Sequence, residues 1–169
     1  MATATPPWLA VARALNGTRE AAGPANNPTI MGWAKRLGIK VLGIAYNADS
    51  VPWCGVFVAH CMREAEIAPA PIAVRAKAWA SWGSRLQPER LALGAVLVFE
   101  RPGGGHVGFY VGEDQTAYHV LGGNQGNRVS IMRIAKDRLV ASRWPTGWPV
   151  IGRPVWLSTD GVPVSRDEA

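Results

Sequence analysis

The sequence lacks the long apolar runs, the paired cysteines and the basic blocks that mark several large classes of protein. No apolar run approaches the roughly 18 residues of a membrane-spanning helix, so we expect no membrane span. The only cysteines, Cys54 and Cys61, lie on one predicted helix with Cα atoms about 10 Å apart, which is too far for a disulfide. Helix-turn-helix and aromatic-plus-basic patterns are also missing, so we expect no nucleic-acid partner.

Acidic residues and histidines are few. The 12 Asp and Glu residues against 18 Lys and Arg leave a net charge of +6, which suits an anionic polymer such as that of the bacterial envelope. Three scattered histidines argue against a zinc site, which needs three protein ligands together. The N-terminus has no basic leader before an apolar core, so we expect synthesis in the cytoplasm without a signal peptide.

The length of 169 residues suits one domain with a single core. Residues 1–149 form the predicted catalytic domain. Residues 150–169 are rich in proline and polar side chains, and we expect a tail there, held by Val155 and Trp156.

The chain changes its hydrophobic period at about Gly94. Before this point the pattern is helical, and after it short alternating or buried runs are separated by turns. Helices followed by strands predict an α+β fold, with N-terminal helices packed on one side of a C-terminal antiparallel sheet. The predicted helices cover residues 6–16, 28–37 with Gly38 as the stop, a segment that begins just before Cys54, and 73–82, with a loop over 38–48.

The segment around Cys54 places a cysteine in the first turn of an amphipathic helix. Asp49 or Ser50 is expected to cap the backbone N–H groups, and Pro52 suits a first turn because its missing donor costs nothing there. A thiol at a helix N-terminus lies at the positive end of the helix dipole, which favours thiolate. Cys54 is therefore the candidate nucleophile, and the alternative is a small core residue that ends the apolar face.

A thiolate nucleophile needs a nearby base that can also protonate the leaving group, and histidine is the usual one. His60 lies six positions after Cys54 and points away from the thiol on a helix, while His119 lies in the middle of a strand. His106 begins a strand after a glycine-rich loop, at a sheet rim where sites are commonly built. Gly108 leaves space beside it for the cysteine helix. His106 is the predicted base.

A third polar residue should orient the imidazole through the ring nitrogen that does not face sulfur. The segment GGNQGN follows the next strand and returns to the rim that His106 occupies. Asn124 is the first choice. Gln125 is the competitor because the register is uncertain by one residue, and Asn127 is a further alternative. The segment can also be turn chemistry alone.

The segments PWCGVFVAHCM, GGGHVGFYVG and VLGGNQGNRVSI together resemble the CHAP family of cysteine, histidine-dependent amidohydrolases and peptidases. This family lies within the papain-like group that includes the NlpC-type wall peptidases. The resemblance covers about residues 7–148 and implies a papain-like fold, with Cys54, His106 and Asn124 as nucleophile, base and orienting residue. Many members carry an acidic residue near the third position, where this chain has none. Some bind calcium through acidic residues upstream of the cysteine, but here Asp49 stands almost alone, so we expect no metal.

The resemblance implies cleavage of amide bonds in peptidoglycan, as by a phage lysin, a tail-associated lytic enzyme or an interbacterial amidase effector. Trp53 and the loop from Arg101 to Gly105 are expected to line the substrate groove, and the alternative for Trp53 is a plain core residue. We expect a monomer without a cofactor that acts on the bacterial cell wall or in the periplasm, with peptidoglycan as its partner. An effector would add an immunity or delivery protein. Acyl transfer by the same Cys-His pair and a non-catalytic wall-binding domain are the alternatives.

Overall fold

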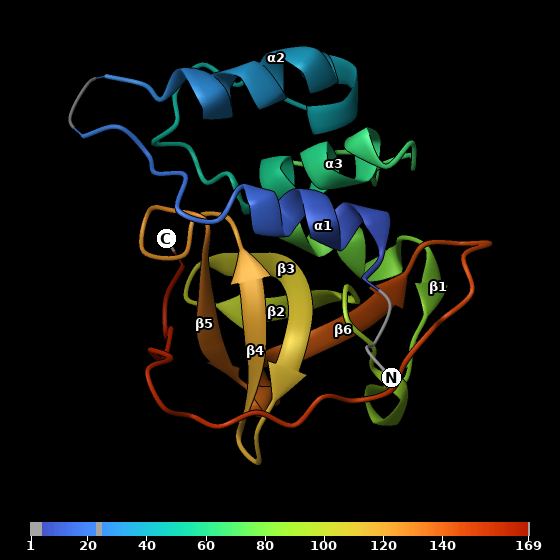
Figure 1. Cartoon of the computed structure of the whole chain (residues 1–169). Helices are drawn as coiled ribbons and strands as arrows, with labels where there is room; N and C mark the ends of the chain where they lie inside the picture. The colour runs from blue at the N-terminus through green and yellow to red at the C-terminus, as the bar shows by residue number, and fades with distance from the viewer. Residues whose placement is uncertain (1–4, 23–24, 169) are drawn as a thin grey trace.

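The computed structural model describes residues 5–22 and 25–168. A layer of helices lies on one side of a six-stranded antiparallel sheet, with α3 between the sheet and α2 (Figure 1). The predicted mixed fold of helices and an antiparallel sheet is confirmed. The helices are α1 (Pro7–Ala14), α2 (Pro28–Leu42), α3 (Cys54–Glu64) and the short 3₁₀ turns η1 (Ala76–Ser81), η2 (Pro88–Arg90) and η3 (Lys136–Arg138).

The sheet has the order β1-β6-β2-β3-β4-β5, so its longest strand, β3, lies inside it between β2 and β4. In the pairing of β2 with β3, Phe99 lies opposite His106. The pairing of β3 with β4 shifts between Tyr110 and Gly112, where β3 bends. The strands are β1 (Ser84–Arg85), β2 (Val96–Arg101), β3 (Gly104–Glu113), β4 (Ala117–Gly122), β5 (Ser130–Ala135) and β6 (Leu139–Trp144).

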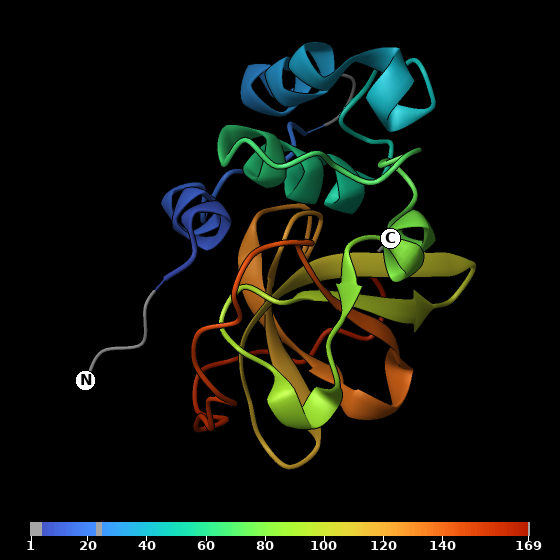
Figure 2. The ribbon, with the colours of Figure 1, turned by 90° about the vertical axis from the view of Figure 1, so that its right-hand side faces the viewer.

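Helix α3 is the central element of the core. Every residue from Cys54 to Met62 is buried, although the sequence predicted burial of one face. The second face is covered by α2 (Figure 2). Trp33 of α2 packs against Phe57 at 5.9 Å and stacks on the His60 ring at 5.1 Å. On the sheet side, Phe57 meets Phe109 of β3 edge to face at 6.0 Å. The first residues of α3 are therefore held from both sides.

The prediction that Asp49 or Ser50 caps this helix is wrong. The helix begins at Cys54 as expected, but its N-cap is Trp53, and no side chain bonds to the first N–H groups. The carboxylate of Asp49 instead accepts hydrogen bonds from the backbone N–H groups of Ala21, at 2.8 Å, and Asn27, at 2.7 Å. Asp49 therefore ties the N-terminal segment to the approach of α3.

Two other predicted helices differ from the structure, one in where it ends and one in its type. Gly38 interrupts α2 with φ of 81°, but the helical backbone resumes and continues to Leu42, so part of the predicted loop is helical. Residues 73–82 form turns and the 3₁₀ helix η1, where a regular helix was predicted. The Ala73 carbonyl there accepts the indole N–H of Trp79 at 3.0 Å.

The predicted tail runs along the sheet (Figure 1). Trp156 forms a parallel bridge with Glu113 of β3, and Val164 forms one with Arg133 of β5. The backbone N–H of Val155 also donates to the Tyr110 hydroxyl at 3.0 Å. Across residues 5–22 and 25–168, no helix has both the length and the apolar character that crossing a bilayer requires.

The close packing of α3 predicts opposite effects of the same substitution at two helical glycines. A Cβ at Gly55 would overlap the Ala73 carbonyl oxygen and lie 2.9 Å from that of Val74, whereas a Cβ at Gly32 of α2 would meet nothing within 4 Å. Gly55→Ala should lower the free energy of unfolding by about 1–3 kcal/mol or more, because backbone must move. Gly32→Ala should raise it by about 0.5–1 kcal/mol, since alanine loses less backbone entropy in a helix. Urea unfolding of both variants measures the difference, and a harmless Gly55→Ala would contradict the packing.

Candidate active site

The structure brings Cys54 and His106 together. Cys54 is the first residue of α3, and His106 lies near the start of β3, the strand on which α3 packs. Cys54 is 4% exposed and His106 is fully buried. The gap that was expected beside Gly108 does not exist, because Val120 of β4 fills it. The pair is therefore enclosed, and only a small part of Cys54 meets solvent.

The imidazole of His106 is held by Gln125. The distance from His106 Nε2 to Gln125 Oε1 is 2.8 Å. The Gln125 amide nitrogen donates to the carbonyl oxygens of Val120, at 3.0 Å, and Ser130, at 2.8 Å, so both of its N–H groups are used. The amide oxygen, which can only accept, must then face the histidine, and Nε2 must carry a proton.

This bond leaves the other ring nitrogen free. Nδ1 of His106 is buried and makes no hydrogen bond of regular geometry in the described structure. In a neutral imidazole whose Nε2 is protonated, Nδ1 is the basic nitrogen. It can therefore accept a proton from Cys54, the neighbouring thiol that interacts with this ring.

Cys54 and His106 shift each other's protonation. Burial alone would raise the pKa of Cys54, but its interaction with His106 and bonds from the backbone of Val107 and Gly55 lower that pKa overall. Burial alone would lower the pKa of His106, but the interaction with Cys54, the charge of Glu168 and the bond to Gln125 raise it overall. Both shifts favour the thiolate–imidazolium form of the pair.

The structure does not place Asn124 on the imidazole. Its side-chain amide donates to the backbone carbonyl of Glu168 at 2.9 Å, and the position beside His106 belongs to Gln125, the competitor. The backbone of Asn124 is left-handed, with φ of 60°, so the alternation of a strand no longer applies there. Asn127, the further alternative, has the same backbone form, with φ of 59°, and its carbonyl accepts the Glu20 N–H.

The other two histidines have structural partners. His60 stacks on Trp33, and burial lowers its pKa. His119 lies 2.8 Å from the carboxylate of Asp114, which Arg133 also binds. Arg133 and the backbone N–H groups around Thr116 hold the pKa of Asp114 well below its usual range.

The two predicted substrate-binding residues have different surroundings. Trp53 is fully buried, donates to the Glu20 carboxylate at 3.1 Å and packs so close to Gly123 that a Cβ there would lie 2.8 Å from the indole. Trp53 therefore supports the loop that carries Gln125 and does not line an open groove. Gly105 is partly exposed, and a Cβ there would lie 2.8 Å from the Lys77 side chain.

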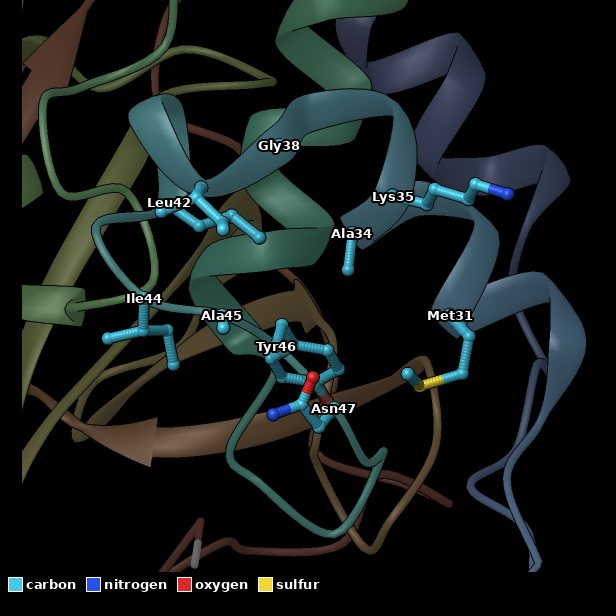
Figure 3. A pocket seen from close by; sticks show the side chains of 10 residues that line it. Met31, Ala34, Lys35, Gly38, Leu42, Ile44, Ala45, Tyr46 and Asn47 are labelled. Carbon is cyan, nitrogen blue, oxygen red and sulfur yellow. The ribbon is translucent and has the colours of Figure 1, made fainter.

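A groove of about 400 Å³ lies between α2 and residues 44–47 (Figure 3). Its lining is mostly apolar, and Lys35 and Asn47 add polar groups. Tyr46 lines the groove and donates its hydroxyl to the Val51 carbonyl at 2.8 Å. Burial, then the negative charges of Asp49, Glu20 and Cys54, raise the pKa of Tyr46.

Sequence reasoning missed Glu168, which lies in the predicted tail and is 1% exposed. No motif or period connects it with Asn124, which lies more than forty residues earlier, so only the folded chain reveals the contact. The sequence did contain a signal that favours Gln125 over Asn124 as the orienting residue. An asparagine that follows a pair of glycines tolerates a left-handed backbone, which would have removed Asn124 from the strand pattern.

Among the described residues, no three His, Cys, Asp or Glu side chains gather in a way that could hold a metal ion.

A scan against protein-family models finds no match for this chain, and a search of the curated proteins finds none either.

The two cysteines should react at different rates. The pKa of Cys54 is lowered, whereas burial raises the pKa of Cys61 well above its ordinary value. Cys54 should therefore be alkylated by iodoacetamide at pH values below the free thiol pKa of about 8.5, while Cys61 stays unreacted. Peptide mapping of protein labelled at several pH values measures the alkylation rate of each cysteine. His106→Ala should slow the alkylation of Cys54 near neutral pH. Faster labelling of Cys61 would contradict the site.

Proposed function

We propose that the protein is a cysteine hydrolase that cleaves an amide bond of bacterial peptidoglycan. The observation that carries this proposal is the pairing of Cys54 with an imidazole whose Nε2 is held by Gln125 and whose Nδ1 is free. This is the arrangement that a thiol nucleophile and its base require. The substrate class rests on the three CHAP-like segments and on the net charge of +6.

The reaction follows from the protonation states. The Cys54 thiolate attacks the amide carbonyl, and the imidazolium of His106 donates its Nδ1 proton to the departing amine. A water molecule then loses a proton to Nδ1 and attacks the acyl-enzyme, which releases the acid and restores the thiolate–imidazolium pair. The carbonyl oxygen becomes negatively charged in each step. The backbone N–H of Cys54, at the first helical position, has no intrahelical acceptor and is a donor for this oxyanion.

The papain-like arrangement is part of this proposal. A helix that begins with the nucleophile and packs on a strand that carries the base supports it. In this arrangement Gln125 takes the role of the orienting residue, and Asn124 supports the loop that carries it. Analysis of the products by mass spectrometry of digested peptidoglycan identifies the bond that is cut. Products joined to an added amine in place of water would instead indicate acyl transfer.

Digestion of purified cell walls by single variants tests the roles. Cys54→Ala should abolish digestion, and His106→Ala should lower its rate by about 10²–10⁴-fold, because general acid–base catalysis is lost. Gln125→Ala should cost less than His106→Ala, since a loosened ring still visits the working orientation. Cys61→Ala should digest walls like the parent and is the matched control.

The double variant His106→Ala with Gln125→Ala gives a sharper result. Its loss should be close to that of His106→Ala alone, because residues that act as one unit have non-additive effects. Thermal unfolding of each variant confirms that it is folded. A Cys54→Ala variant that digests walls at the parent rate would refute the hydrolase, and additive losses would remove Gln125 from the orienting role.

A further inference from the structure

The end of the described chain returns to the candidate site. Glu168 is almost fully buried, and its backbone carbonyl accepts the Asn124 side-chain N–H at 2.9 Å. Figure 1 shows this end of the chain beside the loop that joins β4 to β5. Gln125, the next residue of that loop, holds His106. The segment 165–168 is therefore attached to the loop that orients the imidazole.

The carboxylate of Glu168 is held in place by several bonds. Arg138 of η3 binds it in a forked pair, with contacts of 2.5 Å to Oε1 and 3.2 Å to Oε2. The Ser165 hydroxyl donates to Oε2 at 2.5 Å. Arg138 also donates to the backbone carbonyls of Ser165, at 3.1 Å, and Glu100, at 2.8 Å. A buried charge that is bound in this way has a fixed position.

The site needs a second negative charge. Gln125 is neutral, so it orients His106 without compensating the charge of an imidazolium. While the thiolate is present, it balances that charge, but the balance is lost when sulfur bonds to the substrate and the negative charge moves to the carbonyl oxygen. A buried cation without an anion is costly. Glu168 is an anion of fixed position beside the same loop.

We propose that Glu168 is a positioning residue that serves the site in two ways. Its backbone carbonyl holds the loop that carries Gln125. Its carboxylate stabilises the imidazolium of His106. The catalytic meaning of this inference rests on the proposed hydrolase function. The proposed effect of the Glu168 charge on His106 does not depend on any substrate.

The charged groups around the pair agree with this role. After burial and the Cys54 interaction, the charge of Glu168 raises the pKa of His106. In the other direction, burial would raise the pKa of Glu168, but Arg138, the charge of His106 and Ser165 lower it overall. The titratable groups that act on His106 are thus Cys54 from α3 and Glu168 from the C-terminal segment, and Arg138 is the other cation on Glu168.

The test measures the pKa of the His106 ring by NMR in a Cys54→Ala background, in which the thiol cannot contribute. Glu168→Gln keeps the shape of the side chain and removes its charge. It should lower the pKa of His106 by about half a unit to one unit, because the imidazolium loses a nearby anion. Glu168→Asp, which keeps the charge, should recover part of this shift. Asp160→Asn removes an exposed carboxylate that lies earlier in the C-terminal tail and should leave the pKa of His106 unchanged.

A second measurement covers the case in which Glu168→Gln does not fold. Coupling between two titrating groups is reciprocal, so His106→Ala should raise the carboxyl pKa of Glu168 by a similar amount, read from its ¹³C shift. No change in either experiment would overturn the inference and leave the hydrolase untouched. A parent protein that digests no peptidoglycan would refute the hydrolase and leave the measured coupling in place.

In an active enzyme, the same Glu168→Gln variant should lower kcat about threefold to tenfold, as expected from a pKa change of that size, with little change in KM. A change confined to KM would contradict the electrostatic role.

Discussion

The side-chain amide of Gln125 donates to carbonyl oxygens of Val120 on β4 and Ser130 on β5, and its oxygen meets Nε2 of His106. Turning this amide over would leave two buried carbonyls without donors and place two donors against the ring nitrogen. Each unpaired buried group costs about 1–3 kcal/mol, so the sheet permits one orientation only. The tautomer of His106, and with it the unprotonated state of Nδ1, therefore follows from how the ends of β4 and β5 are joined.

The same enclosure explains why the pair can be charged. Burial opposes both the thiolate of Cys54 and the imidazolium of His106 when each is taken alone. Together they carry no net charge, and their attraction is strong where water is excluded. The packing of α3 between α2 and β3 keeps the two groups in contact, because neither the helix nor the strand has room to shift.

The C-terminal segment extends this arrangement to a third charge. Its path along the sheet, fixed by bridges at Trp156 and Val164, delivers Glu168 to the loop that carries Asn124 and Gln125. Arg138 anchors the carboxylate at the other end of the contact. Asn124 thus links the segment to the loop, although it does not touch the imidazole.

The sequence by itself located the two elements that carry Cys54 and His106. Periodicity located the helix that begins at Cys54 and the strand that contains His106, because a helix start and a change of period are local properties of the chain. Only the tertiary structure decided whether Asn124 or Gln125 reaches the imidazole, since the left-handed backbone at Asn124 breaks the strand alternation. Only the tertiary structure also decided that Asp49 binds the N-terminal segment and does not cap the helix, and that Glu168 binds Arg138. Both depend on segments far apart in the chain, and the side chain of each bonds to the group that folding brings within reach.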